Sequence, residues 1–119
     1  MRRRDLLIAA AAAAAAPRLA AAGGAPELVV YDGRFAEAEG FGRAAQRRGV
    51  QAFDARGDVA RLWYGPLKTA RRTGQRARIS GLTTWADFQV LAGCAAEARI
   101  RPVRHRFLPD RQLVSWTIG

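Results

Sequence analysis

Short apolar runs alternate with helical stretches along residues 27–119, and this alternation constrains the fold more than any other feature. Five runs favour β-strands, because they are short, apolar or alternating, and bounded by turn-forming residues. They cover residues 27–32, 50–54, 77–82, 99–108 and 113–118. Strands that alternate with helices imply right-handed crossovers and a mostly parallel sheet between helices. The sequence therefore predicts a small α/β domain.

The helical stretches have apolar stripes and recognisable ends. Residues 34–48 precede Gly49, a typical C-terminal stop, and their stripe consists of Phe35, Ala38, Phe41 and Ala45. Asp58 is a typical N-cap for a helix over 59–64, and Pro66 starts a further turn. Thr84-Trp85-Ala86-Asp87 resembles a capping box before the last helix. The apolar stripe of that helix consists of Phe88, Leu91, Ala92 and Ala95.

The last two strands set the expected sheet order. Residues 113–118 alternate, which places Val114, Trp116 and Ile118 on one face. The turn at 109–110 predicts an antiparallel hairpin with residues 99–108, in which Pro102 favours an edge or a bulge. We expect three layers and the strand order 2-1-3-4-5, with the fifth strand antiparallel at the edge. A ferredoxin-like α+β fold is the alternative.

The first 22 residues have the layout of an export signal. Arginines stand at positions 2–4, and an apolar run covers 6–16 before Pro17. A helix over that run is roughly 16 Å long, about half the hydrocarbon thickness of a bilayer. Small residues at 20–22 favour cleavage between Ala22 and Gly23. We therefore divide the chain into a signal peptide, 1–22, and one small α/β domain, 23–119.

The residues Arg3-Arg4-Asp5-Leu6-Leu7 resemble the twin-arginine (Tat) signal pattern. The alanine-rich, mildly apolar run after them is also typical of such signals. The segment departs from the pattern in lacking Ser or Thr before the pair, and Ile8 stands where lysine is common. The resemblance implies export to the periplasm by the twin-arginine machinery, with only transient membrane contact through the signal. An ordinary secretory signal with an arginine-rich start is the alternative.

The domain that follows the signal is basic. It has 16 basic and 9 acidic residues, a net charge of +7. The charge suggests an acidic protein, nucleic acid or an anionic membrane surface as partner. Export disfavours nucleic acid. One basic group consists of Lys68, Arg71, Arg72, Arg76 and Arg78, with no aromatic residue among them for base stacking, and a second of Arg99, Arg101, Arg104 and Arg106.

No residue set points to catalysis, a metal or a cofactor. Cys94 is the single cysteine, which cannot form a thiolate-rich metal site, and we interpret it as a small buried residue. His105 is the single histidine and is interpreted as structural. Ser80 and Ser115 lie in expected strands without a nucleophile-elbow pattern. The body of the chain is similar only to small exported bacterial proteins, and this resemblance implies no chemistry.

One candidate ligand site follows from the expected sheet order. Ligands of open parallel sheets bind beyond the carboxyl ends of the strands, where the strand order reverses. The loops there contain Asp32 and Arg34 after the first strand, and Thr83 and Thr84 after the third. An arginine and free N–H groups at a helix start suit a phosphate or carboxylate. The alternative is that these residues serve only as caps and turns.

Three functions remain open at this stage. The first is a non-enzymatic, exported accessory or binding protein, the companion of an exported redox enzyme or another acidic protein. The second is a small enzyme or sensor that binds an anionic metabolite at Asp32, Arg34, Thr83 and Thr84. The third is a membrane-surface protein whose arginines contact anionic lipid.

Overall fold

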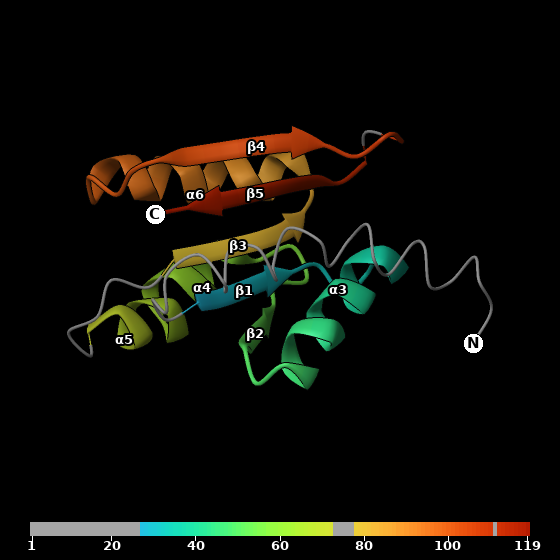
Figure 1. Cartoon of the computed structure of the whole chain (residues 1–119). Helices are drawn as coiled ribbons and strands as arrows, with labels where there is room; N and C mark the ends of the chain where they lie inside the picture. The colour runs from blue at the N-terminus through green and yellow to red at the C-terminus, as the bar shows by residue number, and fades with distance from the viewer. Residues whose placement is uncertain (1–26, 73–77, 111) are drawn as a thin grey trace.

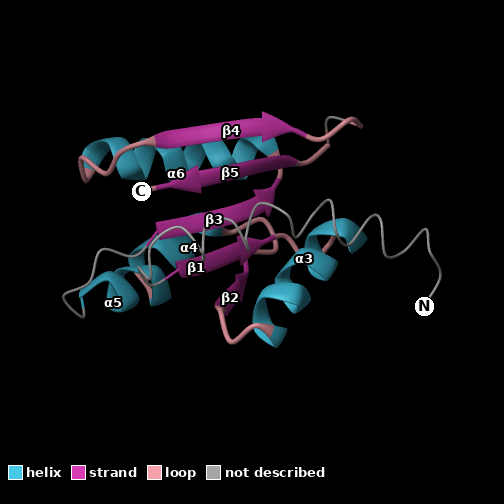
Figure 2. Cartoon of the chain, viewed as in Figure 1, coloured by secondary structure: helices cyan, strands magenta, loops and turns pink. Residues whose placement is uncertain are grey.

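Five strands form one sheet with helices on both faces (Figures 1 and 2). This computed structural model describes residues 27–72, 78–110 and 112–119. The strands are β1 Glu27–Tyr31, β2 Gln51–Asp54, β3 Arg78–Thr83, β4 Val103–Phe107 and β5 Val114–Ile118. The expected signal peptide, 1–22, its cleavage site and Arg76 lie outside the described residues.

The strand order is β2-β1-β3-β5-β4. β1 pairs in parallel with both β2 and β3, and β5 is antiparallel to both β3 and β4. Four of the five strands therefore run in one direction, and the predicted three-layer α/β fold is confirmed. The ferredoxin-like alternative is wrong, because β1 has a parallel neighbour on each side.

The expected order of the last two strands, 2-1-3-4-5, is wrong. β5 lies inside the sheet between β3 and β4, and β4 forms the edge. The reason is the apolar face of β5, where Val114, Trp116 and Ile118 are all buried. β4 is exposed at every residue and follows Pro102, so it tolerates the edge position that proline favours. The antiparallel β4–β5 hairpin itself is confirmed.

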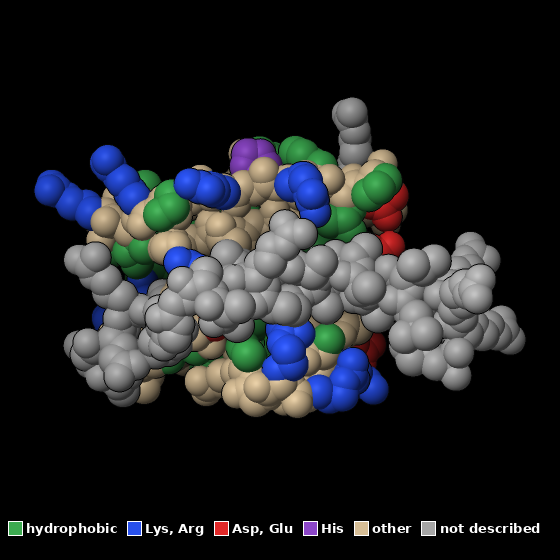
Figure 3. Space-filling model, viewed as in Figure 1, with side chains coloured by type: hydrophobic (Ala, Val, Ile, Leu, Met, Phe, Trp, Pro, Cys, Tyr) green, Lys and Arg blue, Asp and Glu red, His purple; other side chains and the backbone are tan. Residues whose placement is uncertain are grey.

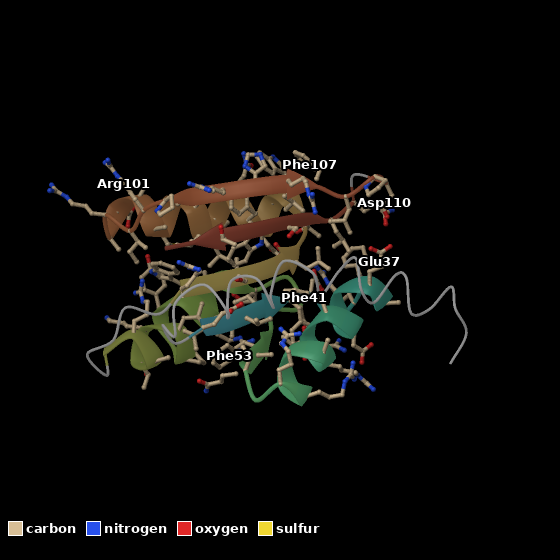
Figure 4. All side chains as sticks on the ribbon, viewed as in Figure 1. Glu37, Phe41, Phe53, Arg101, Phe107 and Asp110 are labelled. Atoms are coloured by element: carbon tan, nitrogen blue, oxygen red, sulfur yellow. The ribbon has the colours of Figure 1, made fainter. Side chains whose placement is uncertain are left out.

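The helices cover the two faces unequally (Figure 2). α3 (Ala36–Arg47) packs on one face, and α4 (Val59–Tyr64), α5 (Pro66–Arg72) and α6 (Trp85–Glu97) pack on the other. The predicted helix over 34–48 is thus shorter, and Arg34 lies in the loop before it. Figure 4 labels Phe41, which α3 contributes to the smaller core. No helix in the described ranges combines the length and the hydropathy needed to cross a bilayer.

Two hydrophobic cores result. The smaller one lies under α3 and contains Val29, Ala38, Phe41, Ala45, Leu82 and Leu113. The larger one includes the predicted core residues Val59, Leu62, Trp63, Leu67, Phe88, Leu91, Ala95, Val114, Trp116 and Ile118. Cys94 is only half-buried, in contrast to the sequence interpretation, because it lies at the margin of that core. Trp116 lies over Gly81, its partner on β3, where a Cβ would collide with the indole ring.

Candidate functional site

The two loops of the predicted ligand site lie at the same edge of the sheet. β1 and β3 are parallel neighbours, so their carboxyl ends lie side by side. The backbone N–H of Asp32 donates to the carbonyl oxygen of Leu82 at 3.2 Å. Thr84 then begins α6 as its N-cap, and its hydroxyl accepts from the backbone N–H of Asp87 at 3.3 Å. The topology therefore brings the predicted loops together.

Within this site, Arg34 is bound to Asp32. The Asp32 carboxylate accepts from Arg34 Nε at 2.9 Å and from Nη2 at 2.6 Å, and it also accepts from the Arg34 backbone N–H at 3.1 Å. Asp32 is fully buried, whereas the Arg34 side chain is half exposed. Burial raises the pKa of Asp32, but the hydrogen bonds from Arg34 outweigh it, and the pKa lies below its usual value. The two groups satisfy each other as a charged pair.

Of the two helix caps expected at this site, the cap on α6 is confirmed and the cap on α3 is wrong. Thr84 caps α6, as expected. Thr83 is fully buried and instead accepts from Trp116 Nε1 at 3.0 Å, while its hydroxyl donates to the Thr84 carbonyl oxygen at 3.1 Å. Asp32 does not cap α3, whose N-cap is Phe35 without a side-chain hydrogen bond. Thr83 thus anchors the core tryptophan and has no donor left over for a ligand.

Sequence reasoning missed Asp54 as part of this edge. Its Oδ1 accepts from the Gly33 backbone N–H at 2.8 Å and from the Arg56 backbone N–H at 3.2 Å. Arg56 Nε also lies 3.3 Å from Asp54 Oδ2. A Cβ at Gly33 would collide with the Asp54 carboxylate, so the close approach requires glycine. The available signal was an aspartate at the carboxyl end of β2, a parallel neighbour of β1.

Asp87 was also missed as a member of the site. It lies in the first turn of α6, is 7% exposed, and its Oδ2 has no hydrogen-bond partner in the described part of the structure. Burial raises its pKa, and the nearby charge of Asp32 raises it further. The available signal was its place as the fourth residue of the expected capping box.

This arrangement has a clear chemical consequence. An incoming anion has to displace a buried carboxylate from Arg34 and approach Asp54 and Asp87 as well. Across the described ranges, no group of three or more His, Cys, Asp or Glu side chains could hold a metal ion. Anion binding at Asp32, Arg34, Thr83 and Thr84 stays a prediction. The contacts themselves are those of a structural junction that joins three strand ends to α6.

A second candidate site is the outer edge of the sheet, which we call the β4 rim: residues 103–107 together with Trp85. All five β4 residues are exposed, Phe107 at 42%. The Trp85 ring centroid lies 5.1 Å from that of His105 and 5.0 Å from that of Phe107. Figure 3 shows basic side chains along this edge, next to the histidine and apolar groups. The rim is therefore basic and partly aromatic.

Comparisons with protein families, curated proteins and solved structures found no match to this chain. Its function is therefore inferred from the chemistry of its own residues.

Proposed function

We propose that this chain is an exported, non-enzymatic accessory protein that binds an acidic protein partner through the β4 rim. The observation that carries the proposal is the exposed edge strand, on which Arg104 and Arg106 are both exposed. Arg99 and Arg101 are also exposed and extend the charge beyond the strand. In Figure 4, Arg101 points away from the body ahead of β4, and Phe107 lies at the far end of the strand.

We choose this surface over the strand-end loops because the arginines of the two sites differ in their ion pairs. Arg34 is bound to Asp32, whereas no ion pair within the described residues involves Arg104 or Arg106. Exposed, unpaired charges increase the rate of encounter with an oppositely charged partner and select it. Unlike the strand-end loops, the β4 rim thus carries charges that are free to act on a partner.

The proposed compartment rests on residues 1–22. The Arg3-Arg4-Asp5-Leu6-Leu7 segment and the alanine-rich run support twin-arginine export, followed by cleavage near Ala22 and Gly23. The export machinery would then be the first partner, and contact with the membrane would be transient. Because this route carries folded proteins, often redox enzymes, an acidic exported redox enzyme is the partner that fits best.

The test is affinity capture from periplasm with matched charge variants. Arg104→Gln with Arg106→Gln removes two charges from the rim, and Arg47→Gln with Arg48→Gln removes two exposed charges at the end of α3. We expect an acidic protein, identified by mass spectrometry, to be retained by wild type and the α3 variant and released by salt. The rim variant should bind it about two- to thirtyfold more weakly, as expected for two exposed charge pairs.

Recovery of the protein as a lone monomer under mild salt would contradict the proposal, as would equal loss of partner in both variants. Binding to vesicles in proportion to their anionic lipid, without any protein partner, would favour the membrane-surface alternative instead.

A further inference from the structure

β4 has a free backbone edge whose hydrogen-bonding groups can be assigned. Within the described residues, β4 pairs only with β5. Beyond the two ends of this ladder and in the same register, the Leu108 N–H donates to the Leu113 carbonyl oxygen, and the Gly119 N–H donates to the Pro102 carbonyl oxygen, both at 2.9 Å. Residues that exchange hydrogen bonds alternate along an antiparallel ladder.

Arg104 and Arg106 therefore direct their backbone groups toward β5. The N–H and C=O groups of Val103, His105 and Phe107 face outward, away from the sheet. These three donors and three acceptors form a complete edge to which another strand can bind.

The side chains of β4 alternate between two chemically different faces. His105 is opposite Trp116 in the ladder, so it shares the face of α6 with Val103 and Phe107. Its ring contacts Phe88 and Trp85 there. Arg104 and Arg106 lie on the other face, opposite Thr117 and Ser115. A strand beside β4 would thus meet aromatic groups on one face and guanidinium groups on the other.

We propose that an extended segment of the acidic partner adds to β4 as a sixth strand, with acidic and apolar side chains in alternation. This inference rests on the proposed function and specifies how the partner is recognised. Carboxylates on one face of the added strand would pair with Arg104 and Arg106. Apolar side chains on its other face would pack on Trp85 and Phe107, which are 36% and 42% exposed. Backbone bonds supply affinity in this mode, and the alternate side chains supply specificity.

Charge decides against a second copy of the same chain as the occupant. Two β4 strands placed edge to edge would bring their arginines together across the new pair, and like charges on paired strands are destabilising. The same arginines attract a strand that carries carboxylates. Charge therefore disfavours pairing between two copies of β4 and favours pairing of β4 with an acidic segment.

The experiment uses the protein purified from periplasm and a synthetic peptide of about eight alternating Glu and Val residues, enough to span the strand. A peptide of the same composition with its glutamates and valines in two blocks is the first control. The second control is a pair of alternating peptides, one N-methylated at the even-numbered amides and the other at the odd-numbered amides. Both keep the side chains, and N-methylation removes the hydrogen bonds that those amides would donate to the edge. Fluorescence anisotropy gives the affinity of each peptide.

We expect the alternating peptide to bind, and the block peptide and one N-methylated peptide to bind at least about tenfold more weakly. Bound peptide should slow amide exchange at Val103, His105 and Phe107, whose N–H groups face outward, and leave Arg104 and Arg106 unchanged. His105→Pro should weaken binding beyond His105→Ala, since both lose the ring and only proline loses the outward N–H.

Absence of binding by the alternating peptide, equal binding of both N-methylated peptides, or unchanged exchange at the three outward amides would overturn strand addition. If His105→Pro does not fold, the exchange and N-methylation results decide on their own. Retention of an acidic partner that is lost with Arg104→Gln and Arg106→Gln, combined with failed strand addition, would leave the proposed function intact. If no acidic partner is retained and strand addition also fails, the proposed function is contradicted as well.

Discussion

Asp87 and Asp32 lie near each other, and burial raises the pKa of both, but their net pKa shifts have opposite directions. Asp32 is held by Arg34 and has a pKa below its usual value, so its contribution to stability is present at neutral pH and is lost as pH falls through the folded-state pKa. Asp87 has one unpartnered oxygen and a raised pKa, chiefly from burial. Its contribution is present below the unfolded-state pKa and is lost as pH rises through the folded-state pKa.

Asp87→Asn should therefore gain stability relative to wild type as pH rises from about 3 to 7, because asparagine has no buried charge to form. Urea unfolding of both proteins across this range measures the difference, and Glu97→Gln, at the exposed end of the same helix, is the matched control. If the difference in unfolding free energy between Asp87→Asn and wild type stays constant with pH, the ionised carboxylate has a partner after all.

At the scale of the elements, α6 connects the core to the rim. Phe88 is 4% exposed and contacts Trp85, His105 and Trp116. Removing its ring leaves a cavity where α6, β4 and β5 meet. Such a change costs roughly 3–5 kcal/mol, against about 5–15 kcal/mol in total for a domain of this kind.

Phe88→Ala should thus bring the domain close to unfolding, as measured by urea denaturation at neutral pH. Val90→Ala, on the same helix but 46% exposed, is the control and should change stability by less than about 0.5 kcal/mol. A loss below about 1 kcal/mol for Phe88→Ala would mean that the surrounding side chains do not depend on this ring.

At the scale of the whole molecule, the proposed function depends on export. Arg3→Lys with Arg4→Lys keeps the charge of the signal but removes the arginine pair, so we expect twin-arginine export to stop. Intact mass of periplasmic wild-type protein should correspond to a chain that begins near Gly23.

Export of the lysine variant at the normal rate would indicate the general secretory route. A full-length mass in the periplasm would instead make residues 6–16 an uncleaved anchor. The first result would change the proposed export route, and the second would change how the protein is attached to the membrane. If neither wild type nor the lysine variant leaves the cytoplasm, export itself is contradicted.

The sequence by itself determined the elements and the face that each presents. The apolar alternation of Val114, Trp116 and Ile118 specifies one buried face of a strand, and Thr84 specifies the start of a helix. These signals are local, since hydrophobic periodicity and capping act over a few residues. They also placed Asp32 and Thr84 at one sheet edge, because parallel neighbours end together.

The tertiary structure decided the order of β5 and β4 and the partners at the strand ends. The apolar face of β5 is best buried when β3 and β4 flank it, whereas β4 carries arginines that stay hydrated at an edge. The contact between Asp54 and Gly33 likewise joins residues far apart in sequence, and packing of the whole fold buries the Asp87 oxygen without a partner in the described part of the structure. These contacts depend on burial and strand pairing across the whole sheet, and no local pattern in the sequence specifies them.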